Sequence, residues 1–79
     1  MDRKAIEEKL YKEDHHYRYL KDKHDELDKE IMKMEKRHPM TYDLELQIET
    51  LKKERLKLKD EMELIVVEYM KKHGEVTWL

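Results

Sequence analysis

The amino-acid sequence predicts an all-α protein, an antiparallel two-helix hairpin of the coiled-coil kind. Three observations lead to this fold class. Ala, Glu, Lys, Leu and Arg supply about half of the 79 residues, and 48% of the chain is charged, which is typical of long helices and coiled coils. Apolar residues recur at spacings that alternate between four and three. The single proline lies near the middle of the chain, where it would end one helix before the next begins.

The first helix is expected over residues 3–37, with Asp2 as its N-cap. A repeat of alternating four- and three-residue steps runs without a break from Ile6 to His38. Because repeats of 3.5 residues sustained over several heptads indicate a coiled-coil seam, they argue against the disorder that the high charge alone would permit. The residues of this helix that we assign to the hairpin seam are Leu20, His24, Leu27 and Ile31.

The second helix is expected over residues 42–73, and the same repeat runs along most of it. A turn over residues 38–41 separates the two helices, with Pro39 as the breaker and Thr41 as the next N-cap. So short a link favours antiparallel neighbours, and folding there places seam positions opposite seam positions. The seam residues of this helix are Leu51, Arg55, Leu58, Met62 and Ile65.

Two polar residues interrupt the seam, His24 and Arg55. We expect His24 to be a packed or hydrogen-bonded core histidine. We expect Arg55 to set the register, with its stem on the seam and its guanidinium near solvent. A buried ligand-binding arginine is the alternative for Arg55.

The open end of the hairpin carries more apolar surface than one neighbouring helix can cover. Residues 64–70 are apolar almost all round, and such a helix should be buried. A second copy would close this surface most simply, as a dimeric four-helix bundle, although a foreign protein or the tail over residues 74–79 could also cover it. The residues that we assign to an oligomer interface are Tyr11, Tyr17, Tyr19, Leu64, Val66, Val67, Met70 and Trp78.

Enzyme chemistry is not expected from this chain. It has no cysteine and no serine, and its single glycine leaves no phosphate-binding loop. We therefore assign no catalytic residue, no metal ligand and no cofactor, and we place residues 1–79 in one domain. The charged start of the chain and the lack of a long apolar run argue against a signal peptide or a membrane span. We expect a cytoplasmic interaction or scaffold protein that acts by helix packing.

A metal-binding bundle is one rival hypothesis. Glu13 with His16, and Glu35 with His38, have the Glu-x-x-His spacing of carboxylate-bridged metal sites. A dimer would have to bring Glu68 to the first pair from both chains. Acidic residues and histidines are common in this sequence, so chance matches are expected.

Nucleic-acid association is the second rival. Residues 52–59 are the one basic concentration, and Lys52, Lys53 and Lys57 could contact phosphates. However, the hairpin would lay this run beside acidic residues of the first helix, and no aromatic residue is interleaved for base stacking. Near-balanced totals of acid and base also give no overall attraction for a polyanion.

Residues 51–61 read Leu-Lys-Lys-Glu-Arg-Leu-Lys-Leu-Lys-Asp-Glu. This block is the most specific part of a resemblance, over residues 10–66, to the YdcH-like family of small bacterial proteins. The resemblance implies a short helical hairpin in a bacterial cytoplasm, with no accepted activity and no catalytic residue. Residues 75–79 depart from the family pattern. Other matching positions are His24, Leu27, Asp28, Ile31, Glu35, His38 and Pro39.

Overall fold

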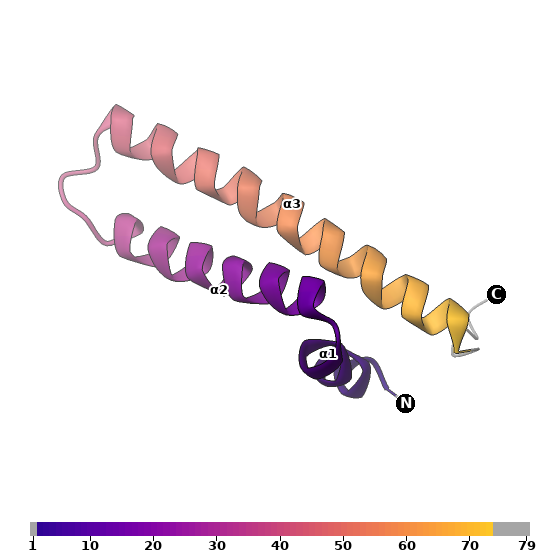
Figure 1. Ribbon diagram of the computed structural model, residues 1–79. Helices are drawn as coiled ribbons and strands as arrows, with labels where there is room; N and C mark the ends of the chain where they lie inside the picture. Colours follow the sequence, from indigo (N-terminus) through magenta and orange to yellow (C-terminus); the bar gives the residue numbers. More distant parts are fainter. Residues whose placement is uncertain (1, 74–79) are drawn as a thin grey trace.

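Three α-helices make up the part of the chain that the computed structural model describes, residues 2–73: α1 (Arg3–Glu13), α2 (His15–Glu35) and α3 (Tyr42–Lys72). The helices α2 and α3 lie side by side and run in opposite directions (Figure 1). At the end where α2 begins and α3 finishes, α1 is turned aside (Figure 1). The all-α class is therefore confirmed, but the described residues form three helices where the sequence predicts two.

The single helix expected over residues 3–37 is wrong, because the chain breaks at Asp14. This residue has an extended backbone (φ −109°, ψ 107°), and its Oδ1 accepts a hydrogen bond from the Tyr17 N–H at 3.0 Å. Asp14 is thus the N-cap of α2. Its own N–H donates to the Leu10 carbonyl at 2.8 Å, which closes α1.

Burial explains why the chain folds back at this point. In the expected register, a straight helix would place Ile6 and Leu10 opposite positions beyond residue 70, at the end of α3. Folded back, both side chains pack instead against Val66, and all three are buried. The break therefore exchanges a few helical hydrogen bonds for apolar burial, at roughly 1.5–3 kcal/mol for each fully buried large side chain.

The other helix ends follow the local signals in the sequence. Asp2 Oδ1 accepts from the Ala5 N–H at 2.8 Å, and Thr41 Oγ1 accepts from the Leu44 N–H at 3.1 Å. Both are N-cap hydrogen bonds. Residues 36–41 link α2 to α3 and contain a cis peptide bond before Pro39.

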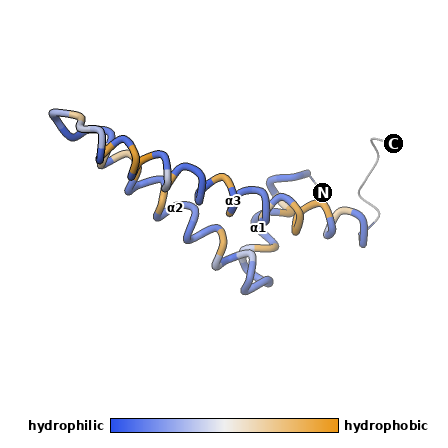
Figure 2. Tube along the Cα trace, turned by 90° about the horizontal axis from the view of Figure 1, so that it is seen from above, coloured by the Kyte–Doolittle hydropathy of each residue, from blue (hydrophilic) through white to orange (hydrophobic). Residues whose placement is uncertain are grey.

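Eight of the ten buried apolar side chains in the described residues form two clusters, one at each end of the α2–α3 pair. Apolar positions recur along both helices between hydrophilic stretches (Figure 2). The link cluster, near residues 36–41, contains Ile31, Met34, Leu44 and Ile48, with Leu51 packed against it. The three-helix cluster contains Ile6, Leu10, Tyr17 and Val66, with Met62, Ile65, Tyr69 and Met70 packed against it.

The seam between α2 and α3 is buried on one side and half-buried on the other. Leu20, Leu27 and Ile31 on α2 are buried. The assigned seam residues on α3 are all half-buried, because a single neighbouring helix covers only one side of α3. Those half-buried residues are Leu51, Arg55, Leu58, Met62 and Ile65.

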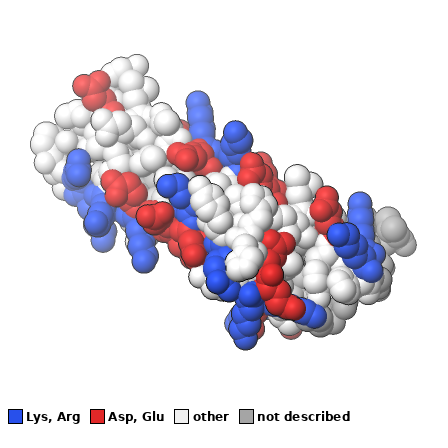
Figure 3. All heavy atoms as spheres, viewed as in Figure 1, with Lys and Arg blue, Asp and Glu red and all other residues white. Residues whose placement is uncertain are grey.

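Polar contacts occupy the middle of the seam. Arg55 Nη1 donates to Asp28 Oδ1 at 2.5 Å across the two helices, and the Arg55 side chain keeps 30% of its surface exposed. His24 is half-buried, and its Nδ1 lies 3.4 Å from Asp25 Oδ1. On the face shown in Figure 3, acidic and basic side chains are interspersed and do not gather by sign.

Candidate interaction site at the three-helix end

The three-helix cluster is where α1, α2 and α3 meet, and it gathers the surplus of apolar residues noted in the sequence. Val66 of α3 is 1% exposed, because Ile6 and Leu10 of α1 and Tyr17 of α2 cover it. Burial raises the pKa of the Tyr17 hydroxyl. The end that the sequence predicts to be open is thus partly closed by the chain's own first helix.

Polar contacts fasten α1 to α3. Arg3 Nη1 donates to Glu63 Oε1 at 2.8 Å, and Arg3 Nη2 donates to the other oxygen of the same carboxylate. These hydrogen bonds, together with the guanidinium charge, hold the pKa of Glu63 below its ordinary value, although partial desolvation opposes the shift. Further along, the Lys9 Nζ lies 5.8 Å from the centre of the Tyr69 ring, an arrangement that favours cation–π attraction.

Arg18 fastens α1 to α2. Its Nε donates to the Tyr11 carbonyl at 2.8 Å, and its Nη2 donates to the Lys12 carbonyl at 3.0 Å. Both carbonyls belong to the last turn of α1, where the carbonyl groups have no backbone N–H donor within the helix. The Tyr11 hydroxyl donates to Asp22 Oδ1 at 2.7 Å, a hydrogen bond that raises the pKa of Tyr11.

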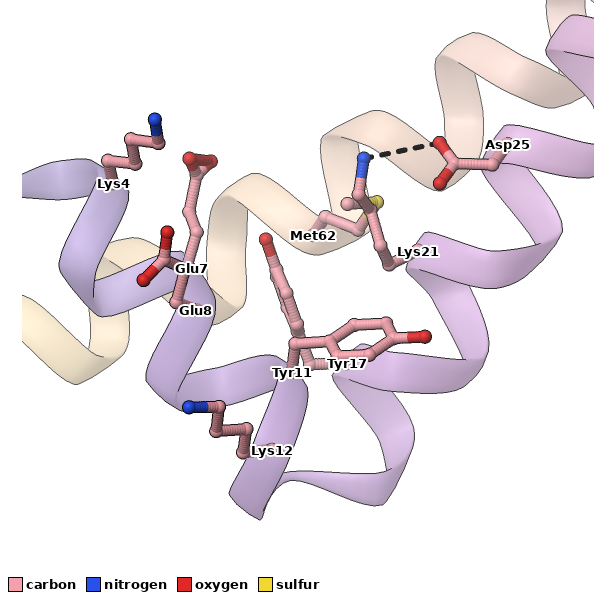
Figure 4. Close-up of a pocket in the computed structure, with 9 residues that line it drawn as sticks. All are labelled: Lys4, Glu7, Glu8, Tyr11, Lys12, Tyr17, Lys21, Asp25 and Met62. Atoms are coloured by element: carbon pink, nitrogen blue, oxygen red, sulfur yellow. Dashed lines mark hydrogen bonds and ion pairs between the residues drawn. The ribbon is translucent and has the colours of Figure 1, made fainter.

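A pocket of about 560 Å³ opens between α1 and the α2–α3 pair. In Figure 4, Tyr11 and Tyr17 lie at its base, Glu7 of α1 is on one side, and Lys21 and Asp25 of α2 are on the other, joined by an ion pair of 3.2 Å. Acidic and basic side chains alternate around the rim, so the pocket has no charge preference. It is lined by Lys4, Glu7, Glu8, Tyr11, Lys12, Tyr17, Lys21, Asp25 and Met62.

The residues assigned to an oligomer interface do not form one surface. Tyr17 and Val66 are buried within the chain, which removes them from the surface that a second molecule could contact. Tyr11 is engaged with Asp22, while Tyr19 is exposed on α2. Leu64 is exposed on α3, Val67 and Met70 are half-buried, and Trp78 lies outside the described residues.

Leu64 points away from the three-helix cluster and belongs to a longer row. Side chains two residues apart on an α-helix point about 200° apart, so Leu64 lies on the side of α3 opposite Val66. Three other exposed apolar residues precede it by about two, five and six helical turns. This outer row of α3 consists of Tyr42, Leu46, Leu56 and Leu64, each between 48% and 73% exposed.

The geometry adds little support to the metal-binding and nucleic-acid hypotheses. Two cations of the basic run contact carboxylates of α2: the Lys52 Nζ lies 3.2 Å from Glu35 Oε2, and Arg55 contacts Asp28. Within residues 2–73, no three acidic or histidine side chains come together as a metal site. None of the helices in this part of the chain is both long and apolar enough to span a membrane.

The residues that hold α1 in place and that sequence reasoning missed are Asp14, Arg18, and Arg3 with its partner Glu63. The signal for Asp14 is an N-cap residue type at a helix start, but the chain contains 20 acidic residues, and the heptad spacing continues past this one. The contacts of Arg18 and Arg3 depend on the fold-back, so no sequence spacing indicates them.

Comparisons with known proteins place the α2–α3 pair in a family. The model of the family described as protein of unknown function (DUF465), to which YdcH-like proteins of bacteria belong, matches residues 18–66. The matched residues take in most of α2 and α3 and leave out α1. No curated protein and no solved structure matches the chain.

Proposed function

This chain belongs to the DUF465 family, and from the geometry of its helices we propose that it is a non-enzymatic scaffold or interaction protein that associates with a second copy of itself. The observation that carries the proposal is the outer row of α3. Four large apolar side chains stand exposed in line along a helix of 31 residues. They form two exposed apolar pairs on one side of α3, Tyr42 with Leu46 and Leu56 with Leu64, and exposed apolar surface marks interaction sites on soluble proteins.

The shape of the row favours a helix as the partner. It is narrow and runs from Tyr42 to Leu64, along about 33 Å of α3 at 1.5 Å per residue, whereas the faces beside it are charged. A helix laid along it would bury the row as coiled-coil partners bury their seams. Two α2–α3 pairs joined in this way form a four-helix dimer.

Charge placement favours a second copy in the antiparallel direction. Lys53 and Asp60 lie on the same side of α3 as the row, at equal distances from a centre near Leu56. In an antiparallel pair about that centre, Lys53 of each copy faces Asp60 of the other, since a two-fold interface repeats every contact. Leu46 then faces Val67, one of the residues that the sequence assigns to the interface.

The test is the oligomeric state of substituted chains, measured by light scattering and sedimentation at micromolar concentration. Leu56→Glu should weaken the dimer strongly while helix content is kept, because each substitution acts twice near the two-fold axis. Met32→Glu is the matched control, since Met32 is 51% exposed, against 59% for Leu56, but lies on α2. A strictly monomeric native chain, or equal effects of the two substitutions, would overturn the proposal.

A charge exchange then tests the direction of pairing. Lys53→Glu should weaken the dimer, and addition of Asp60→Lys to the same chain should restore it, because the reversed pairs again match. Exposed pairs contribute about 0.2–1 kcal/mol each, so the expected change in Kd is several-fold over two pairs. If the double variant dimerises more weakly than Lys53→Glu alone and Asp60→Lys alone, the antiparallel arrangement is refuted.

A further inference from the structure

The connection between α1 and α2 is a single residue, Asp14, inside a continuous heptad spacing. Ile6, Leu10, Tyr17 and Leu20 keep their heptad positions across the break, and the charged Glu13 occupies the position between Leu10 and Tyr17. The sequence on both sides is therefore compatible with one continuous helix. The extended conformation of Asp14, the packing of α1 on α3 and the hydrogen bonds of Arg18 and Tyr11 between α1 and α2 select the folded-back form.

The hold of α1 on the rest of the chain is limited. Its only buried side chains are Ile6 and Leu10, and the pocket of about 560 Å³ lies along its other flank. At 11 residues, α1 is also too short to be a stable helix without a packing surface. An arrangement in which α1 keeps the same packing surface and is joined to α2 as one longer helix therefore competes with the folded-back form.

We propose that α1 is an exchangeable arm, and that two copies of the chain exchange it reciprocally. In the exchanged dimer, each α1 continues straight from its own α2 and packs on the three-helix cluster of the other copy. Ile6 and Leu10 then cover Val66 of the second copy, and Arg3 meets its Glu63. This interface uses the side of α3 that faces α1, so it is independent of the outer row.

Exchange preserves the contacts of Ile6, Leu10 and Arg3 and changes the contacts around the hinge. The Tyr11 and Lys12 carbonyls, which now accept from Arg18, would accept from the N–H groups of residues 15 and 16 in a continuous helix. Against this gain, the N-cap hydrogen bond from the Tyr17 N–H to Asp14 would be lost. The hinge thus sets the balance between the closed chain and the exchanged dimer.

Charge reversal in mixed chains tests whether the Arg3–Glu63 contact lies between copies. One chain carries Arg3→Glu and the other Glu63→Arg, so that in each chain alone the two side chains repel. An exchanged dimer of one copy of each restores both ion pairs, whereas an unexchanged dimer restores neither. The two chains are unfolded together, refolded and analysed by native mass spectrometry.

The expected result is a mixed dimer at more than the statistical two-to-one excess over each parent dimer. The control mixes Lys52→Glu with Glu35→Lys, which reverses an ion pair between α2 and α3 with the same change in net charge. This control pair stays within one copy in either arrangement. An Arg3/Glu63 mixture that matches the control, or that contains only monomers, would overturn the inference.

Hinge substitutions provide a second measurement. His15→Pro suits the folded-back form, because proline is favoured at the first helical position and Asp14 already has the extended backbone that precedes it. In a continuous helix the same proline removes a hydrogen bond and clashes, so the Kd of the exchanged dimer should rise more than tenfold. Asp14→Ala, which removes the cap, should lower it several-fold. Unchanged or opposite shifts, in chains that circular dichroism shows to be helical, would refute the exchange.

Discussion

The docking of α1 on α3 can be tested at Ile6, whose side chain is 0% exposed. The substitution Ile6→Ala deletes three carbon atoms from the three-helix cluster. Removal of a buried isoleucine side chain to the β-carbon costs about 2–5 kcal/mol. The lower part of that range is expected, since α1 lies beside an open pocket and can shift to fill the space.

The loss of stability in Ile6→Ala should be local to α1 as well as global. Ile6 supplies one of only two buried side chains on α1, so its truncation leaves too little burial to hold the helix against its own tendency to unfold. Hydrogen exchange of the amides in residues 3–13 should become fast, while exchange in residues 18–48 should rise only with the global loss of stability. At about 2 kcal/mol, the midpoint of thermal unfolding should fall by roughly 10 °C.

Ile31→Ala is the matched control. Ile31 has the same side chain and is 1% exposed, but it lies in the link cluster, away from α1. It should lower global stability by a similar amount without selective loss of protection in residues 3–13. If Ile6→Ala leaves both the thermal midpoint and the α1 amides unchanged, α1 does not dock as the structure describes.

Three other outcomes are expected. The Arg3–Glu63 contact lowers the pKa of Glu63 from its ordinary 4.5. The contribution of this contact to stability is therefore present above pH 4.5 and is lost as the pH falls through the lowered pKa. Thermal melts between pH 2 and 6 should show this loss in the native chain and a smaller loss in Arg3→Gln. Thr41→Ala should cost about 1 kcal/mol by removing the N-cap of α3, and Thr41→Ser should restore most of it in urea unfolding. A chain with Lys53→Glu and Lys57→Glu should elute from immobilised DNA or RNA as the native chain does, whereas salt-sensitive retention that disappears in this variant would favour nucleic-acid binding.

The heptad repeat was sufficient to predict helices and the buried apolar residues of the seam on α2, whereas the seam residues on α3 are half-buried. Leu20, Leu27 and Ile31 are buried where the repeat places them, and Thr41 caps α3 as its type and position indicate. These features depend on local propensity and on a periodicity that is visible in a linear sequence. The similarity to YdcH-like proteins, confirmed by the family match over residues 18–66, concerns the same part of the chain.

The break at Asp14 could not be predicted in the same way. Its two flanking helices continue one repeat, so the pattern fits a straight helix and a folded-back one equally well. The choice between them depends on whether α3 extends far enough to cover Ile6 and Leu10, which is a property of the register between distant segments. The sequence predicted that the open end carries more apolar surface than one neighbouring helix can bury, and we expected a second molecule to bury it.

Helix content, the position of the link and the burial of the apolar seam residues on α2 thus follow from residue type and spacing alone. The fold-back of α1 and its ion pair with Glu63 were decided by the tertiary structure, as was the outward direction of Leu64. The physical reason is that apolar burial depends on which surfaces meet in space. In this chain the surfaces that decide the fold of α1 are contributed by residues about 60 positions apart, such as Arg3 and Glu63.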